Sequence, residues 1–196
     1  MQITDTKTSL NKEIKRGKNL NIFPSDYTVI DIETTGLSAK YNEIIELSAI
    51  KVRNNNIIDK FSTLVKPNCN INAFITKLTG ITNDMTKDAP NIKDALLKYI
   101  NFIGNDIVVG HNVNFDINFI FHNHLNYHKK EFSNDYIDTC KISRKLCPTK
   151  HHKLDDIAKF YKIDATGHHR AENDCLMTHG IYQAMKNEFL SGRIKE

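Results

Sequence analysis

The sequence predicts a single α/β domain built on a mixed β-sheet that helices cover on both faces. An early β-branched run predicts a strand, a predicted hairpin follows it, and strands then alternate with helices. Alternation of this kind is typical of sheets with helices on both faces. The chain has 196 residues, near the usual size of one domain, so we expect one core.

Three strands open the predicted domain. Residues 27–32 form a β-branched run that the turn at 34–36 ends, and this strand is expected to be central. Segments 44–52 and 57–65 flank the asparagine turn at 54–56. We expect these two segments to pair as an antiparallel hairpin.

The rest of the predicted domain alternates between strands and helices. Apolar runs predict strands at 106–110 and 136–140, the second at a sheet edge. Residues 67–88 are expected to be a loop with one short helix inside it. Apolar residues at helical spacing predict helices over 73–78, 92–103, 115–125, 154–161 and 171–189.

Composition and termini limit the class of protein. Polar, Lys-rich residues 1–26 are expected to form an arm, residues 27–190 the domain and residues 191–196 a tail. There is no apolar run of about 18 residues and no signal-peptide core, so we expect a soluble cytoplasmic protein. Four scattered cysteines without a CxxC pair are expected to be reduced thiols. A net charge of +4 permits a polyanionic partner without requiring one, and the oligomeric state stays open.

Two acids lie at the end of the first predicted strand. Because side chains alternate along a strand, Asp31 and Glu33 point to one face, about 6.6 Å apart along the chain. A buried charge is costly unless it is paired or binds a cation. An ion pair at the strand end, or a helix cap, would also explain these two residues taken alone.

Two further acids follow later elements. Asp116 opens the helix after the fourth strand, and Asp174 lies in the first turn of the last helix. Each alone would be an ordinary acid that matches a helix dipole. Together with His169, however, the four acids can meet in one cleft at the carboxyl ends of strands. Carboxylate ligands of this kind suit Mg²⁺ or Mn²⁺ and not zinc.

The residues around these acids resemble the motifs of the DEDD exonucleases of the His-containing subclass. This family includes the proofreading epsilon subunit of bacterial DNA polymerase III and the exonuclease domain of PolC-type polymerases. The similarity runs from about residue 27 to residue 189. The matching segments are Asp31-Ile32-Glu33-Thr34-Thr35-Gly36-Leu37, Leu78-Thr79-Gly80-Ile81, His111-Asn112-Val113-Asn114-Phe115-Asp116 and His169-Arg170-Ala171-Glu172-Asn173-Asp174.

The resemblance implies a ribonuclease H-like fold with a mixed five-stranded sheet, and removal of nucleoside 5′-monophosphates from a 3′ end with two cations. By the same resemblance, Asp31 would bridge two Mg²⁺ or Mn²⁺ ions. Glu33 and Asp174 would complete the site of the ion that holds the attacking water, and Asp116 would hold the other ion.

The resemblance also implies a general base. The candidates are His169 and its neighbour His168, and the family pattern selects His169 because it stands five residues before Asp174. His168 is then expected to lie in a mobile loop after Gly167.

Substrate contacts are implied for the remaining motif residues. Leu37 and Leu78 would flank the terminal base, although both could instead be core leucines. Arg170 is among the basic residues expected to meet phosphates. The backbone of Thr34, Thr35 and Gly36 would lie near the 3′ hydroxyl, and further contacts are expected from Thr79, His111, Asn112 and Phe115.

The expected partners are a single-stranded or frayed DNA 3′ end and a DNA polymerase catalytic subunit, in proofreading or repair. An RNA-trimming exonuclease of the same superfamily and an inactive nucleic-acid-binding or polymerase-tethering module are the alternatives. The complete set of acids and histidine favours an enzyme, but it does not separate DNA from RNA. The remaining clustered histidines are expected on polar solvent faces; they are His122, His124, His128, His151 and His152.

Overall fold

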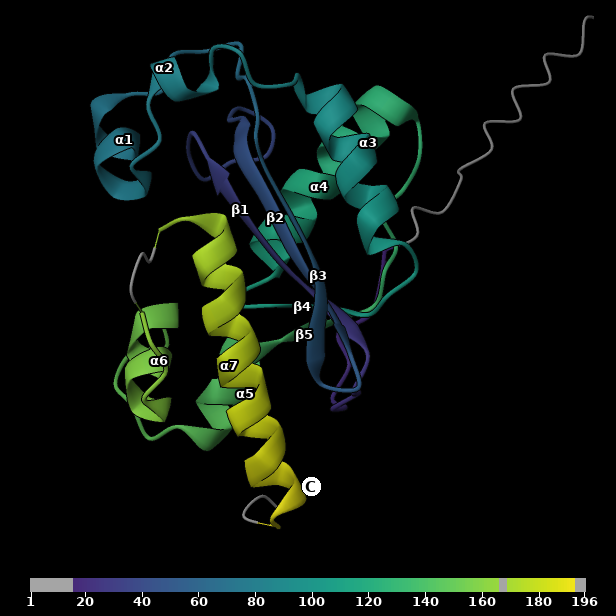
Figure 1. Ribbon diagram of the computed structural model, residues 1–196, viewed down its shortest axis with the longest axis vertical. Helices are drawn as coiled ribbons and strands as arrows, with labels where there is room; N and C mark the ends of the chain where they lie inside the picture. The colour runs from purple at the N-terminus through teal and green to yellow at the C-terminus, as the bar shows by residue number, and fades with distance from the viewer. Residues whose placement is uncertain (1–15, 166–168, 193–196) are drawn as a thin grey trace, which may run out of the picture.

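The computed structural model describes residues 16–165 and 169–192, which form a five-stranded sheet with helices on both faces (Figure 1). The strand order is β3-β2-β1-β4-β5, so the first strand is central, as predicted. β1, β2 and β3 are antiparallel neighbours, while β4 and β5 run parallel to β1. The strands are β1 (Tyr27–Thr34), β2 (Ile44–Arg53), β3 (Asn56–Leu64), β4 (Val108–Gly110) and β5 (Tyr136–Asp138).

Two groups of helices cover the two faces of the sheet (Figure 1). α3 and α4 pack on one face, and α7 packs on the other with α5 and α6 beside it. The helices are α1 (Ala73–Thr79), α2 (Asn83–Thr86), α3 (Ile92–Ile103), α4 (Asn114–His128), α5 (Thr139–Leu146), α6 (Leu154–Tyr161) and α7 (Ala171–Leu190).

Successive side chains of β1 point to opposite faces of the sheet and pack into two different parts of the core. Ile30 and Ile32 are buried in the cluster that includes α3 and α4, whereas Val29 is buried against α7. Asp31 and Glu33 therefore lie on the α7 face, because successive side chains point to opposite sides.

Two helices were not predicted. α2 lies in the segment expected to be loop, and α5 includes Thr139 and Cys140, which were expected to continue the last strand. The physical reason is the same in both cases. The Thr82 side chain accepts a hydrogen bond from the Met85 N–H, and Asp138 accepts one from the Cys140 N–H. Each side chain thus satisfies a free N–H of a first helical turn.

Part of the expected N-terminal arm lies along the edge of the sheet. Asn19 forms a parallel bridge with Tyr136 of β5, whose N–H donates to the Lys18 carbonyl at 2.9 Å. The four cysteines are free thiols, as expected. None of the described helices has the length and apolar character needed to cross a bilayer.

Candidate active site

Three carboxylates from two elements meet at the end of β1. One oxygen each from Asp31, Glu33 and Asp174 lie within 4.8 Å of one another, the one such group among the described residues. β1 supplies the first two on the α7 face, and α7 supplies Asp174 from its first turn. Oxygen ligands in this arrangement can hold a divalent cation.

Asp116 reaches the same strand from α4. Its side chain is buried, and its Oδ1 accepts a hydrogen bond from the Ile32 N–H at 3.1 Å. Ile32 stands between Asp31 and Glu33, so Asp116 is hydrogen-bonded to the backbone of the segment that carries these two acids. The structure thus brings three of the predicted acids into one group and joins Asp116 by a hydrogen bond to the strand that carries two of them.

Burial and repulsion between charges raise the pKa of Asp31, Glu33 and Asp116. Burial and the charges of Asp116, Asp174 and Glu33 raise the pKa of Asp31. Burial, Asp174 and Glu46 raise the pKa of Glu33 to about 8. Burial also raises the pKa of Asp116, against the hydrogen bonds that favour its charged form. A bound cation would displace these protons and supply the missing positive charge.

Glu46 also belongs to this site, although it is in none of the sequence motifs. It lies on β2 opposite Glu33, is 1% exposed, and its Oε1 accepts a hydrogen bond from Arg170 Nη2 at 2.6 Å. Arg170, which was expected to meet phosphates, is therefore ion-paired within the protein. The signal that could have revealed Glu46 is an acid in an otherwise apolar strand.

His169 lies directly before Arg170, the N-cap residue of α7. It has a left-handed backbone with φ of 71°, and its N–H donates to Asp174 Oδ1 at 3.4 Å. The residue therefore sits beside the acid cluster. His168 and Gly167 lie outside the described residues, so the choice between the two histidines stays a prediction.

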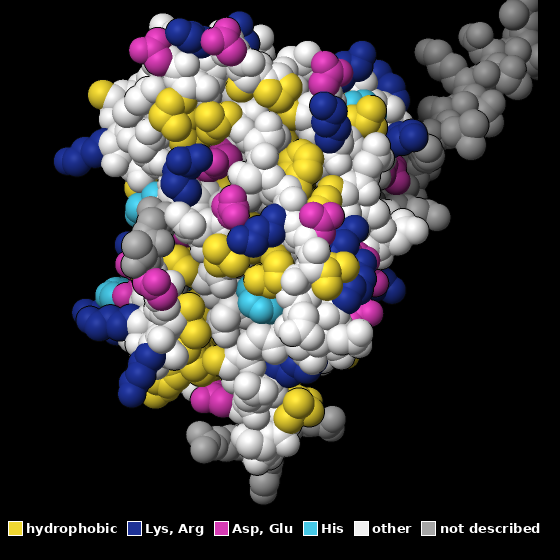
Figure 2. All heavy atoms as spheres, viewed as in Figure 1, with side chains coloured by type: hydrophobic (Ala, Val, Ile, Leu, Met, Phe, Trp, Pro, Cys, Tyr) yellow, Lys and Arg dark blue, Asp and Glu magenta, His cyan; other side chains and the backbone are white. Residues whose placement is uncertain are grey.

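Leu37 and Leu78, the two leucines predicted to flank the terminal base, are on the surface. Leu37 is 89% exposed and Leu78 is 42% exposed, so the alternative that they are core residues is wrong. Phe74, one turn before Leu78 on α1, is also exposed and was not predicted. In Figure 2, hydrophobic side chains gather over the region where Figure 1 places α1 and the end of β1.

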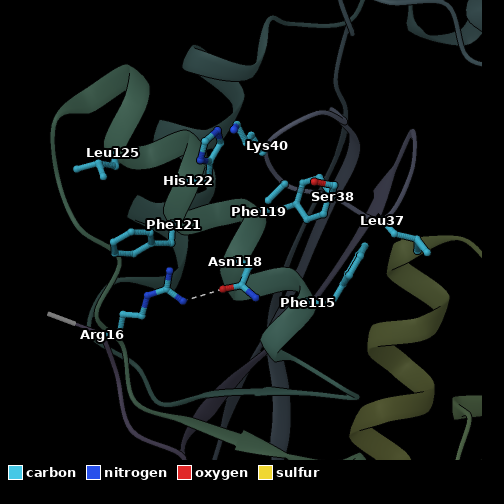
Figure 3. Close-up of a pocket in the computed structure, with 11 residues that line it drawn as sticks. Arg16, Leu37, Ser38, Lys40, Phe115, Asn118, Phe119, Phe121, His122 and Leu125 are labelled. Carbon is cyan, nitrogen blue, oxygen red and sulfur yellow. Dashed lines mark hydrogen bonds between the residues drawn. The ribbon is translucent and has the colours of Figure 1, made fainter. Parts of the chain in front are cut away.

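Leu37 also lines a pocket between α4 and the β1–β2 loop. Figure 3 shows Leu37 and Phe115 at one end of this pocket and Leu125 at the other. Arg16 and Lys40 are the charged residues among the described ones that line it, and both are basic, so this lining favours an anionic or apolar group. The lining residues are Arg16, Leu37, Ser38, Ala39, Lys40, Phe115, Asn118, Phe119, Phe121, His122 and Leu125.

The threonines and glycine of the first motif build the loop that carries Leu37. Thr34 Oγ1 donates to the Gly36 carbonyl at 2.7 Å, and Thr35 Oγ1 accepts from the Glu43 N–H at 2.9 Å. A Cβ on Gly36 would lie only 2.7 Å from the Asn42 side chain. Contacts of their backbone with a substrate stay predictions.

Other motif residues use their side chains or backbone within the fold. His111 bonds the Thr139 hydroxyl at 3.0 Å and the His152 carbonyl at 2.9 Å, and burial lowers the pKa of the His111 ring. The Asn112 N–H donates to Asp138 Oδ1 at 2.9 Å. These bonds hold the loop before α4 in place, and with it the start of the helix that carries Asp116.

The hydroxyl of Thr79 is likewise used inside the fold. Its Oγ1 donates to the Ile75 carbonyl at 3.0 Å and accepts from the Ile81 N–H at 3.1 Å. Thr79, the last residue of α1, is therefore bonded both to the helix before it and to the segment after it. Its predicted contact with substrate is not tested by this arrangement.

One expectation about the extra histidines is wrong. His124 is buried and not on a solvent face, because its ring pairs with His128 at 3.0 Å between the two Nδ1 atoms. His128 in turn bonds the Lys93 carbonyl of α3 at 3.1 Å. His152 is also only partly exposed, and its Nδ1 bonds the Ser143 hydroxyl at 2.9 Å. These side chains pack elements together.

The chain matches a known family and known structures. A family model described as Exonuclease (RNase_T) matches residues 28–182. DNA polymerase III PolC-type of Caldanaerobacter subterraneus is 41% identical over 176 residues, which are 88% of this chain. The PolC-type polymerase of Bacillus subtilis is 44% identical over 153 residues, 76% of this chain.

Among solved structures, Exonuclease X in complex with 5′ overhanging duplex DNA is similar with a TM-score of 0.67 and 27% identity. The similarity covers 84% of this chain and 92% of that one. In contrast, the matched region is 12% of the Caldanaerobacter polymerase and 10% of the Bacillus polymerase. The chain thus corresponds to about a tenth of these much larger relatives.

Proposed function

Because the chain belongs to this exonuclease family, we propose that it is a 3′–5′ exonuclease that releases nucleoside 5′-monophosphates from DNA. The observation that carries the proposal is the meeting of Asp31, Glu33 and Asp174 within 4.8 Å. Asp116 is attached to the same strand at Ile32. An inactive binding module has no need of four acids that repel one another, whereas a metal-dependent nuclease does.

The acids suit divalent cations, because carboxylate oxygens are hard ligands. As the family resemblance implies, two Mg²⁺ or Mn²⁺ ions would be held by these acids: Asp31 would be a ligand of both ions, Glu33 and Asp174 of one, and Asp116 of the other. When bound, such ions stabilise the charge that develops on phosphate oxygens and lower the pKa of water.

We assign His169 as the general base that takes a proton from the attacking water. An imidazole has an ordinary pKa of about 6.5, so it can accept a proton at neutral pH. Water attacks phosphorus, the bond to the 3′ oxygen of the preceding nucleotide breaks, and that oxygen is protonated. The terminal nucleoside 5′-monophosphate is then free to leave.

The exposed leucines hold the terminal base in this proposal. Leu37 lies in the β1–β2 loop and Leu78 on α1, and both side chains are exposed, so both are available to contact a base. Contacts of this kind tolerate any base, so little sequence preference is expected. A base can enter only after it has left its partner, which favours single-stranded or frayed ends.

DNA is favoured over RNA by the relatives, two of which are DNA polymerases and one of which was solved with DNA. The same relatives favour a role in proofreading or repair beside a polymerase catalytic subunit. The RNA-trimming alternative uses the same acids, so it is an outcome of the test below.

The test is digestion of 5′-labelled single-stranded DNA, mispaired duplex DNA and short RNA, each with Mg²⁺, with Mn²⁺ and with chelator. Stepwise shortening that needs the cation is expected, fastest on DNA. Asp31→Asn should abolish it, while Asp59→Asn, an exposed acid on β3, serves as the matched control. Faster digestion of RNA would favour the alternative substrate, and no digestion of any substrate would contradict the enzyme.

A further inference from the structure

A buried acid on β2 takes the place of the missing N-terminal cap of α7. The residue at the cap position is Arg170, and its side chain makes no capping hydrogen bond. Instead, Glu46 Oε2 accepts from the Ala171 N–H at 3.0 Å, although the two residues are 125 positions apart. A carboxylate at a helix N-terminus also interacts favourably with the helix dipole.

Glu46 also holds the neighbouring arginine. Arg170 Nη2 donates to Oε1 at 2.6 Å, and Arg170 Nε lies 3.2 Å from both carboxylate oxygens. All these contacts fix the segment 170–171 to β2. Asp174 follows within one helical turn, so the same contacts set where its carboxylate lies relative to β1.

The position of Glu46 is electrostatically costly. It is directly opposite Glu33 in the β1–β2 register and is 1% exposed, so it adds a further negative charge beside the four acids. Like charges directly opposite on neighbouring strands are destabilising. A cap alone does not require this charge, because the single side-chain oxygen of a glutamine could accept the hydrogen bond from the Ala171 N–H.

The negative charge of Glu46 has a second effect, which is to hold the Arg170 guanidinium. The guanidinium pairs with Glu46, which lies directly opposite Glu33 in the β1–β2 register, so Arg170 is held next to the ligand carboxylates by an acid that is not one of the assigned ligands. Without that partner, Arg170 would be attracted to the ligand carboxylates and would compete with a cation for them.

We propose that Glu46 is a positioning residue of the metal site: it caps α7 so that Asp174 faces Asp31 and Glu33, and it holds Arg170 away from these ligands. The inference rests on the proposed function, since it concerns how this chain's residues receive a divalent cation. Residues that orient ligands in this way typically contribute about 10–100-fold to metal affinity.

The test is Mn²⁺ binding, measured by isothermal titration calorimetry on the whole chain without substrate. Glu46→Gln keeps the shape and the capping oxygen but removes the charge, and should weaken Mn²⁺ binding at least about tenfold. In Glu46→Gln with Arg170→Gln the competing cation is also gone, so most of that loss should be recovered. Melting temperatures in metal-free buffer show that each variant is folded.

The matched control is Asp106→Asn. Both Asp106 carboxylate oxygens accept from Arg53 Nη2 at 2.8 Å, and Asp106 is outside the one carboxylate cluster found among the described residues. This variant should lose stability and keep the Mn²⁺ affinity of the unsubstituted chain.

The outcomes separate this inference from the proposed function. If the unsubstituted chain binds Mn²⁺ and Glu46→Gln binds it within twofold as well, the inference is wrong and the proposed function stands. If the double variant is as weak as Glu46→Gln, competition by Arg170 is wrong. If the unsubstituted chain binds no Mn²⁺, both the inference and the metal of the proposed function fail.

Discussion

Asp116 accepts a hydrogen bond at 3.1 Å from the backbone N–H of Ile32, the residue between the two acids of β1. The start of α4 is thereby joined to the central strand at the acid cluster. A substitution at Asp116 consequently acts on the geometry of β1 as well as on charge. The Asp31 side chain makes no hydrogen bond to the backbone among those described. A substitution at Asp31 therefore tests the charge of the acid cluster with less effect on the backbone.

We predict that Asp31→Asn removes at least about 99% of the nuclease activity and leaves the fold intact, because one ligand is lost while repulsion falls. Its melting temperature in metal-free buffer should equal or exceed that of the unsubstituted chain. Glu33→Gln, Asp116→Asn and Asp174→Asn should also remove most activity. Full activity of purified Asp31→Asn would contradict the metal assignment.

We predict that the metal-free chain becomes less stable as pH rises from about 4.5 to 8. The pKa of Glu33 is raised from 4.5 to about 8, so the folded state binds a proton that the unfolded state has lost. Stability from this group is complete below pH 4.5 and is lost as the pH passes through 8. Asp31 and Asp116, whose pKa values are also raised, act in the same direction.

Melting temperatures of the unsubstituted chain and of Glu33→Gln in chelator, at pH 5 and pH 8, measure this effect. Glu33→Gln should be the more stable of the two at pH 8, and the difference should shrink at pH 5. A free energy of 1 kcal/mol shifts the melting temperature of such a domain by about 2–4 °C, so the difference is measurable. An equal difference at both pH values would show that Glu33 ionises normally.

The acids could be predicted from sequence because their positions follow from local rules. Strand alternation puts Asp31 and Glu33 on one face, and the first turn of α7 carries Asp174. Glu46 could not be placed in the same way. Its partners lie 124 and 125 residues away, and only the register of β1 with β2 brings it opposite Glu33.

The two missed helices have a similar explanation. α5 begins directly where β5 ends, with β-branched Ile137 and Thr139 on either side of the capping Asp138. These two β-branched residues favour a strand, but the hydrogen bond from the Cys140 N–H to Asp138 stabilises the start of a helix at Thr139. In contrast, the sequence alone does not show whether Leu37 and Leu78 are surface or core residues, because this depends on their exposure in the folded chain.

We predict that His169→Ala lowers the single-turnover rate by about 10²–10⁴-fold and changes DNA affinity little, because a general base acts in the transition state. His168→Ala should leave both quantities near those of the unsubstituted chain. Single-turnover digestion and fluorescence anisotropy with a labelled oligonucleotide measure the two quantities. Equal losses of rate in both variants would mean that the base is assigned to the wrong residue.

Finally, we predict that a mispaired 3′ terminus is removed faster than a paired one, and that Leu78 is needed for removal of both. Leu37 is 89% exposed and Leu78 is 42% exposed, so both can contact a base that has left its stack. Unpairing costs a few kcal/mol and costs least at a mismatch, so the DNA itself supplies the selectivity. Leu78→Ala should therefore slow both substrates, since it removes the contact that holds the extruded base. Leu97→Ala is the matched control, because Leu97 is 43% exposed on α3 and belongs to none of the substrate-binding motifs. If a blunt, fully paired end is removed as fast as a mispaired one, and Leu78→Ala behaves like Leu97→Ala, the exposed leucines do not hold the terminal base.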